Sequence, residues 1–353
     1  MMDVRSKLDT LVKGFLPVLY QEDDPDYEAH RTDNKELYRY WEWPQGVGLF
    51  GLWKLFEKTG DKEYLAMLES YYDQRLAAGL PGKNVNTMAP VLALVYLARH
   101  TGREDYLQVA EEWVGWLYGG GLPRTDEGGW QHRTTDDVNE QELWDDTLMM
   151  SVMPMAALGR LEGKREYLEE AEYQLLLHIE HLADPVTGFW YHGYTFKEKS
   201  HFSGAFWGRG NAWATVVMPL LVDEIRPSEG VRRYVSAVMT RQAEALLRVQ
   251  DESGLFHTLL DKEDSYLESS CTCGFGYGIL KGISLGLLDS KYKIIAERAL
   301  PAVLSLIDED GIVAKCSAGT PMGRVSQDFY REIPVHPMPY GQALAIMFLM
   351  EAM

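Results

Sequence analysis

The chain repeats the motif Thr59-Gly60-Asp61-Lys62-Glu63-Tyr64-Leu65, which returns as Thr101-Gly102-Arg103-Glu104-Asp105-Tyr106-Leu107. Weaker copies start at Gly163, Gly230 and Asp289. In every copy an apolar segment ends, a glycine or polar turn follows, and a charged amphipathic segment begins, as where one helix stops and the next starts. Such recurrence at intervals of tens of residues is typical of stacked helical hairpins.

Apolar and amphipathic segments alternate along the whole chain around these motifs. The apolar segments, expected to form inner helices, are 47–58, 90–100, 147–161, 212–225, 274–288 and 341–350. The amphipathic segments, expected to form outer helices, are 62–78, 104–118, 165–182, 231–249 and 291–307, and an N-terminal helix with Leu8, Leu11 and Phe15 on one face is the sixth.

Two architectures fit this alternation, a closed ring and an open α-solenoid. The N-terminal outer helix has no inner helix before it, and the last inner helix has no outer helix after it. Joining the two ends completes the sixth pair. We therefore expect an all-α fold, an (α/α)6 barrel of six inner and six outer helices, with residues 1–353 forming one catalytic domain because no linker interrupts them.

Composition limits the possible partners and compartment. The 353 residues are 46% hydrophobic and carry a formal charge of −19, from 34 basic and 53 acidic residues, which argues against nucleic acids and anionic membranes. No apolar run is long enough to span a bilayer, and the N-terminus does not look like a signal peptide. Cys271, Cys273 and Cys316 have no zinc-ligand spacing and suit a reducing compartment. We expect a cytoplasmic protein whose oligomeric state the sequence leaves open.

Two adjacent carboxylates stand between Trp144 and the apolar run 148–155. Burial and a like-charged neighbour both favour the protonated form of a carboxyl group, so Asp145-Asp146 can hold a carboxylic acid ready near neutral pH. Alternatively, one aspartate caps the helix that starts at Thr147. The two interpretations are compatible, one for each aspartate.

Three loops, 128–132, 187–192 and 253–257, place aromatic residues and a histidine just after a glycine turn. Each loop leads into an inner helix, so we expect all three at the same end of the barrel, where a pocket should form. A single histidine in such a loop is more often structural than catalytic. The histidine spacing fits no metal motif, and we expect neither a metal nor a cofactor.

Segment 207–213, Trp207-Gly208-Arg209-Gly210-Asn211-Ala212-Trp213, is the most specific motif. An arginine between two glycines can approach a ligand closely, and its planar fork suits a carboxylate. Asn211 is a candidate N-cap for the apolar helix that follows, and the tryptophans offer flat faces to sugar rings. The alternative is a glycine-rich turn whose arginine pairs with a structural aspartate.

Four motifs together resemble the unsaturated rhamnogalacturonyl hydrolases, glycoside hydrolase family 105, from about Trp41 onward. They are 144–147 (Trp-Asp-Asp-Thr), 190–194 (Trp-Tyr-His-Gly-Tyr), 207–213 and 266–270 (Tyr-Leu-Glu-Ser-Ser). The unsaturated glucuronyl hydrolases of family 88 share the barrel and the Arg-Gly-Asn signature. The resemblance implies an (α/α)6 barrel and hydrolysis of a small oligosaccharide that ends in a 4,5-unsaturated uronic acid.

The resemblance also implies roles for individual residues. Asp146 matches the catalytic aspartate, which protonates C4 of the enol ether and then takes a proton from the water that adds at C5. His192, Arg209, Trp207 and Trp213 match active-site residues, and we assign Arg209 to the anionic edge of the sugar. The expected substrate-binding residues are Trp43, Asn86, Trp144, His192, Trp207, Arg209, Asn211 and Trp213.

One position departs from the family pattern, since Asn86 stands where members can place a second aspartate. An amide can hold a hydroxyl or water but cannot titrate, and capping a helix is an equally good role for Asn86. The loop 324–339 is expected to cover the rim of the pocket.

We expect a hydrolase acting on pectin-derived rhamnogalacturonan fragments. The alternatives are an unsaturated glucuronyl hydrolase acting on glycosaminoglycan fragments, an α/α-barrel sugar isomerase, or a sugar-binding protein.

Overall fold

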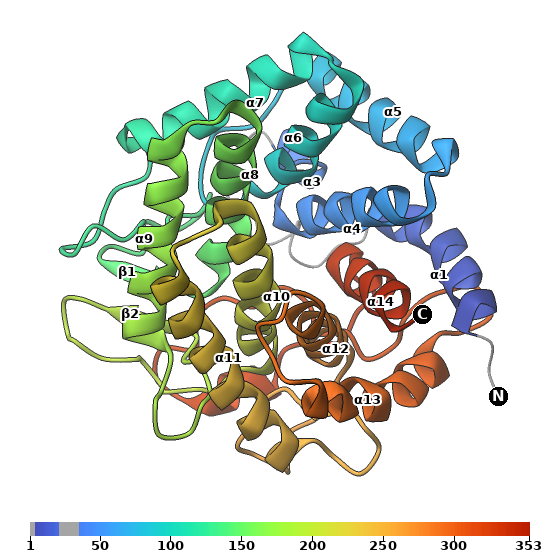
Figure 1. Ribbon diagram of the computed structural model, residues 1–353, viewed down its shortest axis with the longest axis vertical. Helices are drawn as coiled ribbons and strands as arrows, with labels where there is room; N and C mark the ends of the chain where they lie inside the picture. The colour runs from blue at the N-terminus through green and yellow to red at the C-terminus, as the bar shows by residue number, and fades with distance from the viewer. Residues whose placement is uncertain (1–3, 21–34) are drawn as a thin grey trace.

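The computed structural model describes residues 4–20 and 35–353 and shows two concentric rings of helices (Figure 1). The inner ring consists of α4 (Trp43–Thr59), α6 (Ala89–Thr101), α8 (Met153–Glu162), α10 (Gly208–Ile225), α12 (Ser269–Ser284) and α14 (Pro339–Ala352). The outer ring consists of α1 (Val4–Leu19), α5 (Lys62–Ala78), α7 (Glu104–Trp116), α9 (Arg165–Leu182), α11 (Glu229–Val249) and α13 (Lys293–Leu306).

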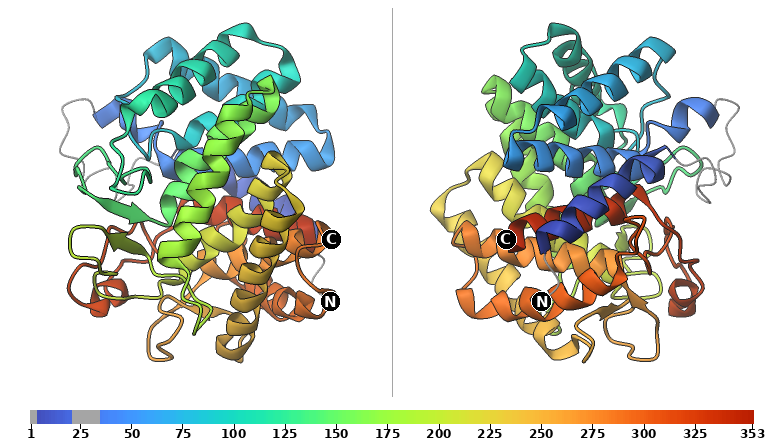
Figure 2. Two further views of the ribbon diagram at one scale, coloured as in Figure 1. Left: turned by 60° about the vertical axis from the view of Figure 1, so that its left-hand side comes forward. Right: turned by 90° about the vertical axis from the view of Figure 1, so that its right-hand side faces the viewer.

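The ring is closed. The last inner helix, α14, packs against both α4 and α12, and the N-terminal outer helix α1 packs on α14 (Figure 2). These contacts exclude the open solenoid and confirm the all-α (α/α)6 barrel. A helix buried on all sides reads as apolar all round, and one buried on a single face reads as amphipathic, which is why the alternation in the sequence predicts the two rings.

Short elements fill the connections. They are α3 (Lys35–Arg39), the π-helical turns η1 (Leu117–Gly121) and η2 (Leu148–Val152), and the 3₁₀ turns η3 (Ser290–Tyr292) and η4 (Gln327–Arg331). Strands β1 (Glu142–Trp144) and β2 (Gly193–Thr195) form one antiparallel ribbon, and β3 (Phe256–His257) and β4 (Leu267–Glu268) form another. Both ribbons lie at the end of the barrel where the inner helices begin.

The repeated motif is a helix stop followed by a helix start. Gly60 ends α4 with a φ of 68°, a left-handed conformation in which its N–H reaches back to the carbonyl of Phe56. Asp61 then caps α5, because its side chain accepts a hydrogen bond from the N–H of Glu63. Gly102 and Gly163 end α6 and α8 in the same left-handed conformation.

Three inner helices begin four or five residues earlier than the sequence predicts, the first being α4, which starts at Trp43 where 47 was expected. Helix α10 starts at Gly208 and α12 at Ser269, where starts at 212 and 274 were expected. The glycines of the 207–213 motif are therefore part of a helical turn, where close packing excludes side chains. A Cβ at Gly208 would lie 2.8 Å from the carbonyl oxygen of His257, and one at Gly210 would lie 2.2 Å from the Asp145 carboxylate.

Features that bear on the compartment are few. Within residues 4–20 and 35–353, no helix is both long enough and apolar enough to cross a membrane. Cys271, Cys273 and Cys316 are buried free thiols, and burial raises the pKa of Cys271 well above its usual range, so that this thiol stays protonated and unreactive.

Helix packing around α12 gives a test of the fold. A Cβ at Gly278 would lie 2.4 Å from the backbone oxygen of Thr215 in α10, so Gly278→Ala forces the two inner helices apart. We expect this change to lower the free energy of unfolding by about 1–3 kcal/mol, measured by urea denaturation.

The control for this prediction is Gly115→Ala in the outer helix α7, where an added Cβ meets nothing within 4 Å. Alanine should raise the stability there by about 0.5–1 kcal/mol, because it is the better helix former. Equal midpoints for the two variants would contradict the packing at Gly278.

Candidate active site

The ribbon of β1 and β2 positions the two aspartates. Trp144 lies opposite Gly193 in the antiparallel register, and the N–H of Asp145 donates to the carbonyl of His192 at 3.0 Å. The strands thus bring the 144–147 and 190–194 motifs side by side, although almost fifty residues separate them in the chain. The inner helix that follows Asp146 begins as the π-helical turn η2.

A chain of hydrogen bonds leads from the C-terminal loop to Asp146. The N–H of Gly323 donates to the hydroxyl of Tyr330 at 3.0 Å, and this hydroxyl lies 2.7 Å from His192 Nδ1. His192 Nε2 lies 3.1 Å from Asp146 Oδ2. Because the hydroxyl accepts from Gly323, its own proton is available to Nδ1, and the tautomer that satisfies the chain carries hydrogen on Nε2 and donates it to Asp146.

The two aspartates differ in their environments. The carboxyl group of Asp145 is fully buried, and neither of its oxygens has a hydrogen-bond partner among the described residues. Burial, reinforced by the neighbouring Asp146, raises the pKa of Asp145 well above its usual range. Burial acts against ionisation of Asp146 too, but its interactions with His192, the hydrogen bond first, outweigh burial and lower the pKa of Asp146.

The structure corrects two expectations about the aspartates. Neither aspartate caps the following helix through its side chain, since no side chain makes a cap hydrogen bond at the start of η2. In addition, the carboxyl group with the raised pKa belongs to Asp145. Asp146, the residue matched to the catalytic acid, is ionised beside His192. The pair therefore holds one proton and one negative charge in contact.

His132 belongs to one of the three loops expected at the pocket, although it was not among the predicted site residues. Its ring stacks on Trp144 with centroids 4.1 Å apart and planes 8° apart, and its Nδ1 lies 2.9 Å from Thr147 Oγ1. Burial lowers the pKa of His132 to about 3, so the ring is neutral. The glycine turn at 128–129 marked this loop, but only the ribbon brings its histidine to the aspartates. His257, from the third such loop, instead bonds to the carbonyl of Ser265.

Arg209 is held by a loop and does not pair with an aspartate. Its guanidinium lies over the rings of Trp207 and Tyr340, at 4.6 and 4.8 Å from their centroids. Its terminal nitrogens donate to the carbonyl oxygens of Ser317 and Ala318, at 2.8 Å each, and to the hydroxyl groups of Ser317 and Thr320. Arg209 thereby fastens segment 317–320 beside the aspartates.

These residues surround a cavity of about 270 Å³ at the mouth of the barrel. Six predicted site residues line it: Trp43, Asn86, Trp144, Asp146, Trp207 and Arg209. The wall is completed by His132, from a loop expected at this end of the barrel, and by residues that sequence reasoning missed, namely Glu42, Thr134, Asp136, Asp137, Asn139, Met150, Gly319, Thr320 and Pro321. Most of the latter lie on two loops without a distinctive sequence pattern, which explains why they were missed.

Three predicted residues lie behind this wall. His192 is connected to the cavity through its hydrogen bond with Asp146. Asn211 is fully buried inside α10 and does not cap it, since the cap position is Trp207; its side chain bonds to the backbone of Trp190 instead. Trp213 is also fully buried and packs edge-on against Trp43 at 6.4 Å.

Asn86 does not cap a helix either. The side chain of Asn84 accepts hydrogen bonds from the N–H groups of Asn86 and Thr87, which leaves the Asn86 side chain in the cavity wall. In the loop 324–339, Tyr330 supports His192 from behind, and Arg324 forms an ion pair with Glu142. None of the residues lining the cavity comes from 324–339 among the described residues; in this part of the chain the lining residues are Gly319, Thr320 and Pro321, just before the loop, so the expectation that the loop itself covers the rim is corrected.

Asp145, Asp146 and His192 are the one group of described residues with potential metal-ligand atoms close together, within 4.8 Å of one another. In the arrangement described above these atoms share protons: His192 donates to Asp146, and Asp145 retains its own. A metal-free site stays a prediction.

The fold is a helical barrel, and one cavity at its mouth brings together a carboxyl pair, a histidine and tryptophans. This combination is typical of glycoside hydrolases of the (α/α)6 type. Residues 21–353 match Glycosyl Hydrolase Family 88, and the chain belongs to this family. It is 34% identical over 316 residues to the unsaturated rhamnogalacturonyl hydrolase YesR of Bacillus subtilis (strain 168), covering 89% of this chain and 90% of that protein.

Solved structures agree with this assignment. A possible member of the GH105 family from Salmonella enterica is 40% identical with a TM-score of 0.94, and one from Klebsiella pneumoniae is 42% identical with a TM-score of 0.93. Each comparison covers 100% of this chain and 94% of the other. The resemblance to family 105 that the four motifs indicated is confirmed.

The raised pKa of Asp145 predicts a pH effect on stability. The native protein retains this proton at pH values where the unfolded chain has released it, so the free energy of unfolding falls as pH rises from the ordinary aspartate range towards the raised pKa. Asp145→Asn removes this contribution. We expect its stability to depend less on pH, by up to about 1.4 kcal/mol per pH unit, in urea denaturation between about pH 5 and 8.

Asp126→Asn is the matched control because Asp126 is exposed on the 124–130 turn. Its stability should follow the wild-type pH dependence. The same slope for Asp145→Asn and the wild type would show that Asp145 is ionised in the native protein.

Proposed function

We propose that this protein is an unsaturated rhamnogalacturonyl hydrolase. It would remove a non-reducing-end 4,5-unsaturated galacturonic acid from rhamnogalacturonan oligosaccharides derived from pectin. The observation that carries the proposal is the Asp145–Asp146 pair, with opposite pKa shifts, in a cavity lined by Trp43, Trp207 and Arg209. The name of the Bacillus subtilis relative and the family membership support the same activity.

The proposed reaction hydrates a double bond. Asp146 gives a proton to C4 of the enol ether, and the oxygen of a water molecule adds at C5 while the carboxylate takes a proton from that water. The resulting hemiketal opens and releases the rest of the saccharide, so the carboxyl group ends the cycle with the proton it started with. No second carboxylate at the anomeric carbon is required, in contrast to ordinary glycosidases.

The proton for the first step comes from the pair. In the free protein Asp145 holds the proton and Asp146 the charge. The carboxylate of an arriving uronic acid adds a negative charge to the same cavity and raises the pKa of Asp146. Transfer between adjacent carboxyl groups then gives Asp146 its proton only when substrate is bound.

The cavity fits removal of a terminal sugar. Its volume of about 270 Å³ lies at the lower end of small-molecule sites, as suits one sugar ring. Trp43 and Trp207 offer ring faces, and Arg209 places a positive charge in the wall. We further propose that the whole chain acts as one catalytic domain in the cytoplasm, on small oligosaccharides and without a metal.

Loss of the catalytic carboxyl group is the direct test. Asp146→Asn keeps the shape of the side chain but cannot transfer the proton, and we expect kcat to fall by about a hundredfold to ten-thousandfold. The measurement is the decay of the ultraviolet absorbance of the conjugated enol ether in an unsaturated rhamnogalacturonan disaccharide.

Exposed Asp126→Asn serves as the control and should turn over at the wild-type rate. Faster turnover of an unsaturated chondroitin disaccharide by the wild type would reassign the enzyme to glycosaminoglycan fragments. No decay with either substrate would favour a sugar isomerase or a sugar-binding protein instead.

Asn86 offers a second test of the proton transfer. Asn86→Asp adds a carboxylate to the wall of the cavity that contains Asp146. Repulsion favours the protonated form of the pair, so kcat/KM should persist to higher pH, with its alkaline limb shifted by about one pH unit. Asn86→Ala removes the amide without adding charge and should leave the limb in place. A shift to lower pH in Asn86→Asp would contradict the role of the pair as the acid.

A further inference from the structure

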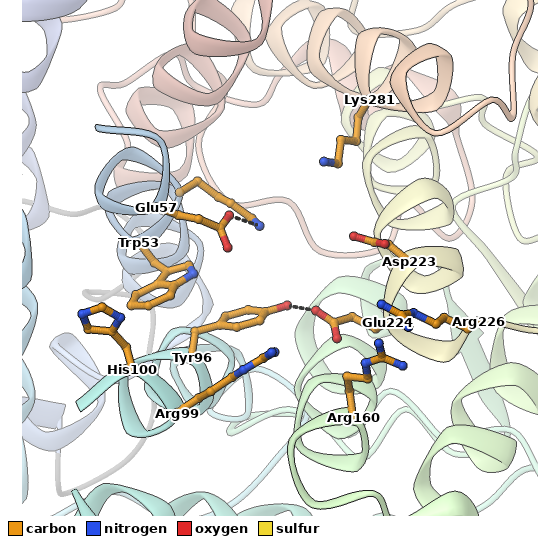
Figure 3. A pocket seen from close by; sticks show the side chains of 11 residues that line it. Trp53, Glu57, Tyr96, Arg99, His100, Arg160, Asp223, Glu224, Arg226 and Lys281 are labelled. Atoms are coloured by element: carbon orange, nitrogen blue, oxygen red, sulfur yellow. Dashed lines mark hydrogen bonds and ion pairs between the residues drawn. The ribbon is translucent and has the colours of Figure 1, made fainter. Parts of the chain in front are cut away.

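A second cavity, of about 560 Å³, lies at the opposite end of the barrel (Figure 3). It is lined from the C-terminal parts of the inner helices, with Trp53 from α4, Tyr96 from α6, Arg160 from α8, Glu224 from α10 and Lys281 from α12. The active-site residues precede or begin these same helices. The length of the inner ring therefore separates the two cavities, and the second one has no part in the proposed reaction.

Cations predominate in the lining of this cavity. Five lysine and arginine side chains and three carboxylates face it, which leaves five minus three, or two, positive charges in excess on a chain whose net charge is −19. Arg99, Arg160, Arg226 and Lys281 make no ion pair or side-chain hydrogen bond with another described residue. Figure 3 shows the three arginines directed to the side of the cavity where Glu224 lies.

The other polar groups around the cavity are arranged differently. Lys54 is paired with Glu57 at 2.8 Å, and the hydroxyl of Tyr96 donates to Glu224 at 2.6 Å. Burial raises the pKa of Glu224 above its ordinary value, and the hydrogen bond from Tyr96 opposes this shift. The buried indole N–H of Trp53 has no acceptor among the described residues, although its ring is fixed by stacking on Tyr96 at 5.7 Å.

The ends of helices account for part of this charge. The inner helices direct their C-terminal carbonyl groups, and hence partial negative charge, to this end of the barrel, and cations near such ends are stabilising. That role requires only that each cation lie near its own helix end. It does not require three guanidinium groups on one side of an open cavity, where the single carboxylate of Glu224 offsets only part of their mutual repulsion.

We propose that this cavity binds a small anion that carries a phosphate group. A phosphate has a charge of about −1.5 to −2, which matches the excess of two cations, and its several oxygens can accept from more than one arginine fork. A carboxylate brings one charge and is satisfied by a single fork. The volume admits a phosphorylated sugar as well as phosphate alone.

The experiment is calorimetric titration of the full chain, at constant ionic strength, with inorganic phosphate, glucose 6-phosphate and galacturonate. We expect saturable binding of a phosphate probe to the wild type and about tenfold weaker binding to Arg160→Gln and to Arg226→Gln. Tighter binding of glucose 6-phosphate than of phosphate would identify a phosphorylated sugar as the ligand class, and equal binding would identify free phosphate.

The control is Arg233→Gln, which removes an exposed arginine from the outer helix α11 and should bind as the wild type does. Thermal unfolding with and without phosphate separates binding from a structural role of these arginines. Loss of helix-end stabilisation lowers Tm whether or not phosphate is present. Loss of the binding site abolishes only the rise in Tm that phosphate causes. No saturable binding, unchanged binding by both variants, or tighter binding of galacturonate than of either phosphate probe would each overturn the proposal.

Discussion

The contact between the Asp145 carboxyl group and Gly210 is the constraint on which the site depends. Any side chain at position 210 would collide with this carboxyl group, because a Cβ there would lie 2.2 Å from Oδ2. The close approach buries Asp145 against the first turn of α10 without a hydrogen-bond partner, and the cost of a bare buried charge keeps it protonated. The negative charge of the pair consequently resides on Asp146, where His192 can donate to it.

The loop that contains Ser317 connects Arg209 and the start of α12 to the wall of the cavity. The buried carboxylate of Glu268 accepts from the N–H of Cys271 at the start of α12 and from the N–H of Ser317 at 2.8 Å, while Arg209 donates to the carbonyl of the same Ser317. The following residues, Gly319 to Pro321, line the cavity. The arginine thus shapes the substrate pocket through its hold on the loop, in addition to the charge it contributes.

The sequence predicted the rings better than the site, for physical reasons. Helices α5 and α9 begin and end at the predicted residues because amphipathic spacing and the turn before each helix are local signals. The distinction between Asp145 and Asp146 is not local. It depends on the register of β1 with β2 and on Tyr330, which approaches His192 from 138 residues further along the chain. Residues such as Asp146 could be found from motifs, whereas their protonation states required the fold.

The two ends of the barrel pose opposite electrostatic problems. At the active site the inner helices begin, and each N-terminus contributes about half a positive charge. An acidic chain can therefore still attract an anionic sugar, although Arg209 is the only lysine or arginine among the described residues of the wall. At the far end the same helices terminate, and their dipoles oppose an anion. An anion site there must therefore be built from side-chain cations, and that is where Arg99, Arg160, Arg226 and Lys281 gather. The direction of the inner helices thus explains why one cavity of this protein needs few basic residues and the other needs many.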